Sequence, residues 1–248
     1  MQPQAQSLAG RIAFVTGAGQ GLGADIARAL RQAGAQVAFT DVDGELAASV
    51  AAEVDGLALA LDVRDEQAFS AAFATAVRHF GAVDILVNNA ARTPTTSLWD
   101  VDVAEWDDVL AINLRGTFFG CRIAGRHMRE RRQGRIVNIA SLAGQQASTA
   151  TGVHYAASKA GQFALTRAFA QELAPQGVTV NALAPAAIAS PALDAMPADR
   201  QAALAAAIPV GRFGQGEEVG AAVVYLASPA AAFMTGATLD LNGGRLMR

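Results

Sequence analysis

Two hydrophobic patterns alternate along this chain from one end to the other. Short apolar runs bounded by glycine or polar residues predict buried strands, and longer segments with apolar residues three or four positions apart predict helices. Strands are expected at residues 11–16, 36–41, 57–61, 83–88, 134–141, 178–184 and about 238–241. Helices are expected at 22–33, around Phe69, Phe73, Val77 and Phe80, and at 43–54, 103–131, 155–173 and 217–227.

This alternation of strands and helices determines the expected fold class. It is typical of parallel strands that are joined by helical, right-handed crossovers. We therefore predict an α/β protein with one domain, a Rossmann-type, doubly wound parallel sheet of about seven strands with helices on both faces. Ligands of such sheets bind outside the carboxyl ends of the strands. Residues that directly follow a strand are therefore the first candidates for a site.

Composition narrows the class of protein. Of the 248 residues, 52% are hydrophobic, which indicates a large core, yet the longest apolar stretches, such as 202–210, are shorter than the ~20 residues that span a bilayer. Residues 1–7 are polar and lack the apolar core of a signal peptide. The single cysteine, Cys121, excludes an internal disulfide and suits a reducing compartment. We expect a cytoplasmic protein without a membrane segment.

The charge distribution argues against nucleic acid as a partner. The formal net charge is -3, although one cluster of arginines could be interpreted as a nucleic-acid patch: Arg122, Arg126, Arg129, Arg131, Arg132 and Arg135. Acidic residues gather at the opposite end of the same predicted helix, at Asp100, Asp102, Glu105, Asp107 and Asp108. Because the helix dipole favours acids at the start and cations at the end, we favour a structural role for the cluster. A small molecule is the expected partner.

A glycine-rich turn joins the first strand to the first helix. Gly17, Gly21 and Gly23 let the backbone approach a pyrophosphate, and the helix that follows offers free amides and a positive dipole end. Asp41 ends the next strand, where a carboxylate can accept hydrogen bonds from an adenosine ribose diol but repels a 2′-phosphate. The neighbouring Gln20 and Thr40 carry no charge. NAD is therefore favoured over NADP, although Asp41 could also serve as the cap of helix 43–54.

The chain has a single lysine among its 19 Lys and Arg residues, and it lies four positions after one of only two tyrosines. On a helix, Tyr155 and Lys159 share one face. Ser141 closes the fifth strand, so a hydroxyl, a phenol and an ammonium are expected to meet. A free phenol titrates near pH 10, and an adjacent ammonium or an oxidised nicotinamide lowers that pKa. The alternative is an ordinary exposed lysine beside a core tyrosine.

With these residues assembled, the sequence resembles the short-chain dehydrogenase/reductase family along nearly its whole length. Thr16-Gly17-x-x-x-Gly21-x-Gly23 matches the family's cofactor turn, and Asp62-Val63 matches the pair that contacts adenine. Asn88-Asn89-Ala90 matches the stabilising motif after the fourth strand, and Ser141 with Tyr155-x-x-x-Lys159 matches the catalytic set. Asn113 falls where the family places a fourth catalytic residue. The departures are Ala91 for glycine, Pro185-Ala186 for Pro-Gly, Ser190 for threonine, and one extra residue between Ser141 and Tyr155. None of them removes a catalytic group.

The resemblance implies a role for each of these residues. Tyr155 exchanges a proton with the substrate oxygen, Ser141 orients that oxygen, Lys159 lowers the tyrosine pKa and binds the nicotinamide ribose, and Asn113 helps to hold a water relay. Hydride passes between C4 of the nicotinamide and the carbinol carbon. The implied cofactor-binding residues are Gly17, Gln20, Gly21, Leu22, Gly23, Asp41, Asp62, Val63, Asn89, Ala90, Tyr155, Lys159, Pro185, Ile188 and Ser190. No metal site is predicted. Family members are commonly homotetramers, here through helices 103–131 and 155–173.

Three functions remain open. We favour an NAD-dependent dehydrogenase of a secondary alcohol, such as a polyol or a sugar. Residues 208–213 and 242–244 look most like β-ketoacyl-carrier-protein reductases, which use NADPH and hold the carrier with two arginines; Arg132 matches one of these and Gln176 replaces the other. A catalytically silent binding or regulatory protein is the third possibility, but such a protein would ordinarily have lost Tyr155 or Lys159. His154 could touch a polar substrate, although a capping or surface role is favoured.

The domain organisation follows from the same analysis. No repeat, linker or shift in composition divides the chain. We expect a flexible N-terminal tail at residues 1–9 and a single dinucleotide-binding and catalytic domain at 10–248. Within this domain, residues 189–210 are expected to form a lid over the substrate.

Overall fold

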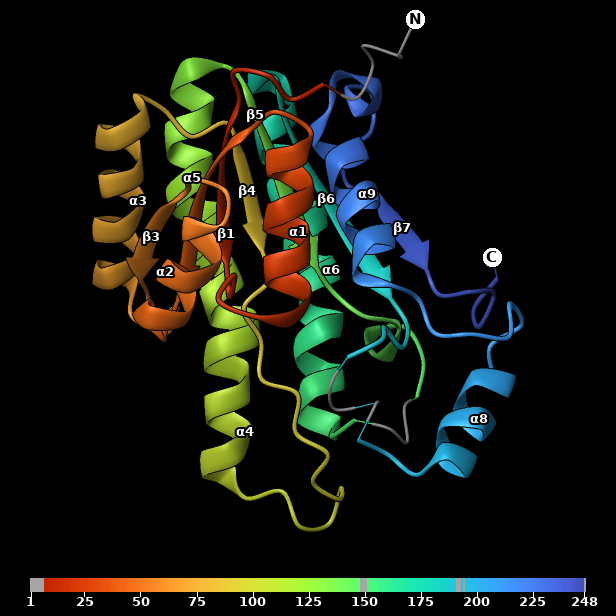
Figure 1. The fold of residues 1–248 in the computed structure, drawn as a ribbon. Coiled ribbons are helices and arrows are strands. Elements are labelled where there is room, and N and C mark those ends of the chain that lie inside the picture. The colour runs from red at the N-terminus through yellow and green to blue at the C-terminus, as the bar shows by residue number, and fades with distance from the viewer. Residues whose placement is uncertain (1–6, 148–150, 191–192, 194, 248) are drawn as a thin grey trace, which may run out of the picture.

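The computed structural model describes residues 7–147, 151–190, 193 and 195–247. Seven parallel strands form one sheet in the order β3-β2-β1-β4-β5-β6-β7 (Figure 1). The strands are β1 (Ile12–Thr16), β2 (Gln36–Asp41), β3 (Leu57–Ala60), β4 (Ile85–Asn88), β5 (Gly134–Ile139), β6 (Val178–Pro185) and β7 (Thr238–Leu241). The strand order reverses between β1 and β4, which confirms the predicted doubly wound α/β fold.

Helices cover both faces of this sheet (Figure 1). They are α1 (Gly21–Gln32), α2 (Gly44–Ala52), α3 (Glu66–Phe80), α4 (Val103–Leu110), α5 (Gly116–Arg131), α6 (Val153–Leu173), α8 (Ala198–Ala206) and α9 (Gly216–Ala227). The strand arrows in Figure 1 point towards α4, α8 and the first turns of α6, so these elements surround the carboxyl ends of the strands. None of the described helices is both long and apolar enough to cross a membrane.

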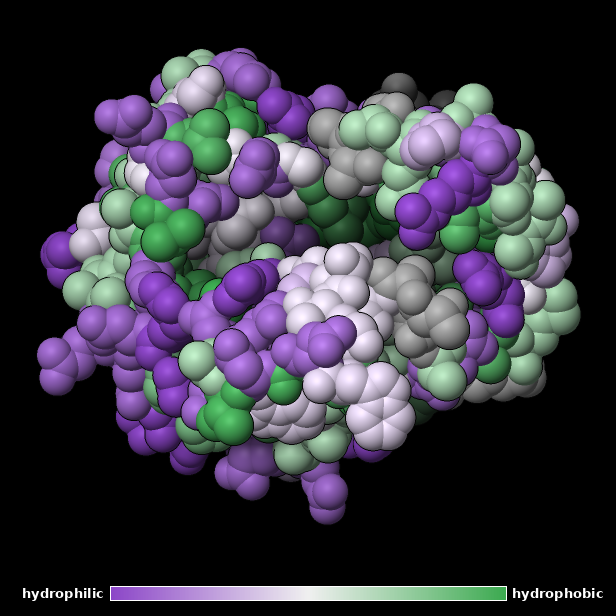
Figure 2. All heavy atoms as spheres, turned by 90° about the horizontal axis from the view of Figure 1, so that it is seen from below, coloured by the Kyte–Doolittle hydropathy of each residue, from purple (hydrophilic) through white to green (hydrophobic). Residues whose placement is uncertain are grey.

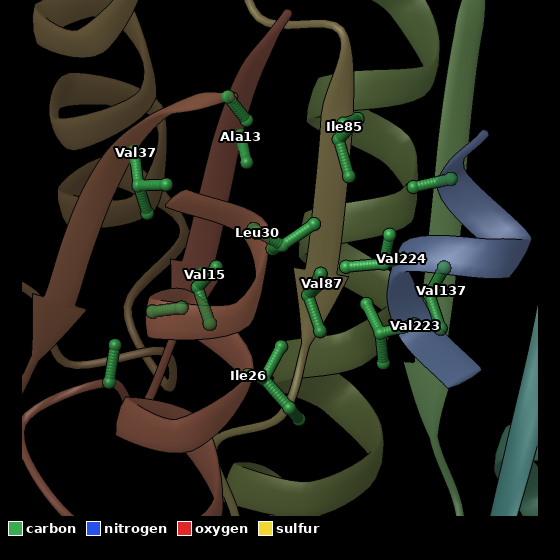
Figure 3. Close-up of a cluster of buried hydrophobic side chains, with 14 of the residues drawn as sticks. Ala13, Val15, Ile26, Leu30, Val37, Ile85, Val87, Val137, Val223 and Val224 are labelled. Carbon is green, nitrogen blue, oxygen red and sulfur yellow. The ribbon is translucent and has the colours of Figure 1, made fainter. Parts of the chain in front are cut away.

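Alternate residues of each central strand face opposite layers of the core. Val15 and its neighbours on the sheet pack against Ile26 and Leu30 of α1 and against Val223 of α9 (Figure 3). On the other face, Phe14 stacks against Phe69 of α3 with ring centroids 5.8 Å apart. Each such side chain contributes about 1.5–3 kcal/mol by leaving water. Because both faces are buried, the strands read as continuous apolar runs in the sequence.

Three helices begin at an aspartate that binds free backbone amides. Asp43 accepts from two amides of α2, Asp65 from two amides of α3, and Asp102 from one amide of α4. A cap of this kind contributes about 1 kcal/mol relative to alanine. Helix α3 ends at Gly81, whose φ of 86° favours glycine.

The helix predicted at 103–131 is interrupted in the structure. A π-helical segment, Ala111–Arg115, separates α4 from α5. Within it, the carbonyl of Asn113 accepts hydrogen bonds from Thr117 Oγ1 (2.8 Å) and Gln162 Nε2 (2.9 Å). Side-chain donors that enter the backbone ladder disturb regular helix geometry. Since Gln162 belongs to a different helix, periodicity along the chain could not reveal this interruption.

The predicted tail and lid differ in how far the structure describes them. Residues 1–6 of the expected tail lie outside the described residues. Leu8, in contrast, is buried, and its amide donates to the Ala33 carbonyl at 2.8 Å, so it belongs to the packed domain. Within the expected lid, residues 191–192 and 194 lie outside the described residues, and residues 198–206 form helix α8, which the sequence analysis did not predict.

Candidate active site

A cleft of about 850 Å³ lies at the carboxyl ends of the strands, beside the point where the strand order reverses. Figure 2 views this end of the molecule and shows the hollow. The residues predicted from the sequence that line it are Gly17, Gln20, Gly21, Leu22, Gly23, Asp41, Asp62, Val63, Asn89, Ala90, Ser141, Tyr155, Lys159, Pro185, Ile188 and Ser190. One cleft thus brings together the expected cofactor-binding residues and three of the four expected catalytic residues.

The glycine turn has no room for larger side chains. A Cβ at Gly23 would lie 1.9 Å from the Gly17 carbonyl oxygen and 2.4 Å from Asn89 Nδ2. Gly17 and Gly21 have φ of 64° and 52°, which favours glycine at both positions. Asn89 Nδ2 donates to the carbonyls of Thr16 and Gly17, at 3.0 Å each, and so ties the turn to the end of β4.

Helix α1 points an uncapped N-terminus at this cleft. The residue before its first turn, Gln20, makes no capping hydrogen bond with any described residue, whereas α2, α3 and α4 are each capped by an aspartate. The free amides of α1 and its positive dipole end are suited to an anion. Because a Cβ at Gly21 would meet no described atom within 4 Å, the turn is open on its cleft side. The arrangement fits the pyrophosphate of a dinucleotide.

Asp41 lies at the next strand end and holds the same turn. Its Oδ2 accepts from the Gly19 amide at 3.0 Å, and its Oδ1 accepts from the Asp43 amide at 3.1 Å. The interpretation of Asp41 as the cap of the following helix is wrong, because Asp43 caps α2. Each carboxylate oxygen of Asp41 has a second lone pair, which can accept a hydrogen bond from a ribose hydroxyl.

One cation of the cleft, Arg64, was not among the residues predicted from the sequence. Arg64 lines the cleft and forms ion pairs with Asp62 (2.7 Å) and Asp108 (2.8 Å), and Asp108 also pairs with Arg92 (2.7 Å). Hydrogen bonds from Arg64 lower the pKa of Asp62, and hydrogen bonds from Arg92 and then Arg64 lower the pKa of Asp108. The positive charge of Arg64 is therefore neutralised by two aspartates, Asp62 and Asp108.

The tyrosine–lysine pair lies in the first turns of α6. Lys159 is 2% exposed, its Nζ donates to the Ile139 carbonyl at 2.6 Å, and it lies 5.5 Å from the centre of the Tyr155 ring. Burial lowers the pKa of Lys159 to about 7. The alternative of an ordinary exposed lysine is therefore wrong.

The pKa of Tyr155 departs from the sequence-based expectation. Burial raises the pKa of this phenol, and hydrogen bonds with Ser141 and Thr93 offset the increase only in part. The sequence predicts that Lys159 lowers it, but burial also lowers the pKa of Lys159 to about 7 and so removes part of the lysine's charge near neutral pH. The protein's own groups thus leave Tyr155 a weaker acid than a free phenol.

Asn113 does not reach the cleft. It is fully buried and is absent from the described residues that line the cleft. Its Oδ1 accepts from the Arg92 amide (2.8 Å), and its Nδ2 donates to the Arg92 carbonyl (3.0 Å) and to Ser158 Oγ (3.1 Å). The side chain therefore joins the segment after β4 to α6. Its participation in a water relay stays a prediction.

His154 matches neither interpretation offered from the sequence. It is fully buried and is not among the described residues that line the cleft. Its Nε2 lies 3.4 Å from Glu105 Oε1, and its ring stacks on Trp106 with centroids 6.5 Å apart. His154 thus packs α6 against α4. A sequence pattern could not reveal this contact between helices.

Thr93 is the main cleft residue that sequence reasoning missed. It lies five residues after the end of β4, lines the cleft and hydrogen-bonds with Tyr155. Its position in the segment that follows the end of a strand was the one feature of the sequence that could have identified Thr93 as a site residue. On the other side, Ser141 accepts from the Ala143 amide at 3.1 Å and so caps a short 3₁₀ turn, Leu142–Gly144, which fixes its position.

Comparisons with known proteins identify relatives of the chain. The family model described as enoyl-(acyl carrier protein) reductase matches residues 17–245. The chain is 40% identical to the 3-oxoacyl-(acyl-carrier-protein) reductase FabG of Vibrio harveyi, over 97% of this chain and 99% of the relative. It is also 40% identical to the 2-dehydro-3-deoxy-L-rhamnonate dehydrogenase (NAD(+)) of Sphingomonas sp. (strain SKA58), over 96% of each chain.

A solved structure gives the same result. A putative short-chain alcohol dehydrogenase from Sinorhizobium meliloti 1021 superposes with a TM-score of 0.90 at 39% identity, covering 97% of this chain and 98% of the other. The similarity in sequence and in fold thus extends over nearly the whole chain. The chain belongs to the short-chain dehydrogenase/reductase family and is an oxidoreductase.

Proposed function

We propose that the protein is an NAD(H)-dependent dehydrogenase that oxidises a small secondary alcohol, such as a polyol or a sugar, and reduces the corresponding ketone. Asp41 carries the proposal. Its carboxylate lines the cleft and is fixed by the Gly19 and Asp43 amides. A fixed negative charge at the adenosine ribose accepts from a free diol and repels a 2′-phosphate. The Sphingomonas relative, whose name specifies NAD(+), supports the same choice.

Different residues of the cleft would bind the cofactor and the substrate. When bound, the nicotinamide supplies the carbon that accepts or donates the hydride. The amides of α1 bind the pyrophosphate, Asp41 binds the adenosine ribose, and Lys159 binds the nicotinamide ribose. Ser141 donates to the substrate oxygen, and Tyr155 takes the hydroxyl proton during oxidation and returns it during reduction. An oxidised nicotinamide, when bound, would place a positive charge near Tyr155 and oppose the increase that burial causes in the tyrosine pKa.

A ketoacyl-carrier-protein reductase is the second candidate. The FabG relative from Vibrio harveyi supports it at 40% identity. The expected carrier-binding positions give weaker support, since Gln176 replaces one arginine. Arg132, at the other position, has a φ of 53° and donates to the Pro175 carbonyl at 3.1 Å. Asp41 also opposes the NADPH that such reductases use.

We also propose a homotetramer that works in the cytoplasm. A groove whose surface is mainly apolar runs between α4, the π-helical segment, α5 and α6. Leu110, Leu114, Phe118 and Leu165 line it, together with the charged Arg64, Asp107, Asp108 and Arg115. Ala157, Ala160 and Ala164 form an exposed face of small residues on α6, which permits close approach of a second copy. The buried, free Cys121 suits a reducing cytoplasm.

A substrate panel tests the proposed function. Polyols, sugars, secondary alcohols and acyl thioesters are each assayed with NAD(H) and NADP(H) by nicotinamide absorbance. We expect turnover of secondary alcohols with NAD, and a decrease of about 10²–10⁴-fold in kcat for Tyr155→Phe, which cannot exchange the proton. Turnover restricted to acyl thioesters with NADPH would establish the second candidate instead.

A further inference from the structure

Two hydroxyls from different loops converge on the phenol of Tyr155. Ser141 approaches from the end of β5, and Thr93 approaches from the segment after β4. Both line the cleft, and Thr93 is exposed to it. One hydroxyl is enough to orient the reacting oxygen. The second hydroxyl is therefore available for another oxygen of the substrate.

The backbone on either side of Thr93 is held firmly. Asn113 binds both the amide and the carbonyl of Arg92, at 2.8 and 3.0 Å. The Pro94 carbonyl accepts from the Gly152 amide at 2.9 Å, next to the start of α6. These bonds fix Thr93 relative to the helix that carries Tyr155. A hydroxyl fixed in this way loses little entropy when it binds a ligand.

The cleft offers few charges to an anionic substrate. Among the described residues that line it, the cations are Lys159 and Arg64. Lys159 is buried on the Ile139 carbonyl, and Arg64 pairs with two aspartates at the far end. Residues 148–150, 191–192 and 194 contain no lysine, arginine or histidine. A carboxylate or phosphate near Tyr155 would lack a matching charge, whereas neutral hydroxyls would find partners.

We propose that Thr93 is a specificity-determining residue that binds a second oxygen on the carbon next to the reacting carbon, so that the substrate class is an uncharged vicinal diol or the corresponding α-hydroxyketone. The inference rests on the proposed function. The two oxygens of a gauche diol lie about a hydrogen-bond length apart. Such a pair matches the Tyr155 and Thr93 hydroxyls, which interact with each other in the lining of the same cleft.

The reaction leaves Thr93 chemically unchanged. During oxidation, the C–H and O–H bonds of one carbinol break and a C=O bond forms. The hydride goes to NAD+, and the proton goes to the phenolate of Tyr155. The neighbouring hydroxyl stays on its carbon, bonded to Thr93, and the product is an α-hydroxyketone.

The test compares 2,3-butanediol with 2-butanol, in the presence of NAD+, for the wild type, Thr93→Val, Thr93→Ser and a control, Thr95→Val. Thr95 lies in the same segment but is not among the described residues that line the cleft. We expect the wild type to have a higher kcat/KM for the diol. Thr93→Val should reduce the ratio of the two kcat/KM values about tenfold or more, because the second oxygen loses its partner. Thr93→Ser should restore the ratio.

Two results would overturn the inference. One is a wild type that does not prefer the diol, and the other is a ratio that Thr93→Val leaves unchanged. In both cases the proposed function stands, provided that the wild type reduces NAD with 2-butanol. If the wild type oxidises no secondary alcohol with NAD, the proposed function is wrong and the inference is wrong with it. The NAD dissociation constant of each variant confirms that it is folded.

Discussion

Lys159 is the only lysine of the chain, and its environment explains why arginine could not replace it. The side chain is buried and its pKa is lowered to about 7. An arginine would keep its proton and add a buried charge without a carboxylate beside it. The residue can therefore change its charge near neutral pH, when a cofactor or a substrate changes the local field. This property belongs to the single residue and its burial.

The lowered pKa makes a prediction about stability. Between pH 7 and 10.5 the unfolded chain holds a proton on Lys159 that the folded protein has released. The free energy of unfolding should therefore rise with pH in this window, by about 2 kcal/mol from pH 7 to 9, relative to Lys159→Met. Urea unfolding of both proteins at several pH values measures this difference. Parallel pH profiles of the two proteins would show that Lys159 stays protonated in the fold.

At the scale of elements, the cofactor site depends on a strand end, a tight turn and an uncapped helix. The turn is closed at Gly23, which packs against Gly17 and Asn89. It is open where the first amides of α1 face the cleft. Among the described helices that begin near this end, α2, α3 and α4 have aspartate caps, whereas α1, α6 and α8 have no side-chain cap. Because Gln20, Gly21, Leu22 and Gly23 also line the cleft, the first amides of α1 are available to a ligand there.

Gly23→Ala tests this arrangement. A Cβ at this position would overlap the Gly17 carbonyl oxygen, so the turn must open and the amides of α1 must move. We expect the NAD dissociation constant to rise at least tenfold, which corresponds to ~1.4 kcal/mol of binding free energy. Gly220→Ala is the matched control, because its Cβ would overlap Ala29 between α1 and α9, away from the cleft. The control should lose stability but keep its affinity for NAD. Equal affinity in both variants contradicts the role of the turn.

The elements also show what sequence patterns could and could not predict. Strands, helices and the glycine turn follow from local periodicity, because burial on both faces gives continuous apolar strands and amphipathic helices. The π-helical segment depends on Gln162, and the position of His154 depends on Glu105 and Trp106, all on other helices. The assignment of Thr93 to the site likewise depends on its contact with Tyr155, which lies on a different element. Contacts between elements were beyond the reach of a linear pattern.

At the scale of the whole molecule, the apolar groove beside α6 predicts association. Leu165→Asp places a charge in this groove, whereas Leu98→Asp places one at an exposed position outside it. We expect the mass of four chains by light scattering for the wild type and for Leu98→Asp. Leu165→Asp should give a smaller species, because the charge cannot be solvated in a closed interface. A monomeric wild type would exclude the proposed tetramer.

The proposed function depends most on the choice of cofactor, which we propose that Asp41 determines. Titration calorimetry of the wild type with NAD and with NADP tests it directly, with Asp41→Asn as the variant and Asp43→Asn, at the α2 cap, as the control. We predict that the wild type binds NAD more tightly than NADP. Asp41→Asn should bring the two dissociation constants closer together, and Asp43→Asn should leave their ratio unchanged. Binding of NADP tenfold tighter than NAD by the wild type would contradict the proposed function.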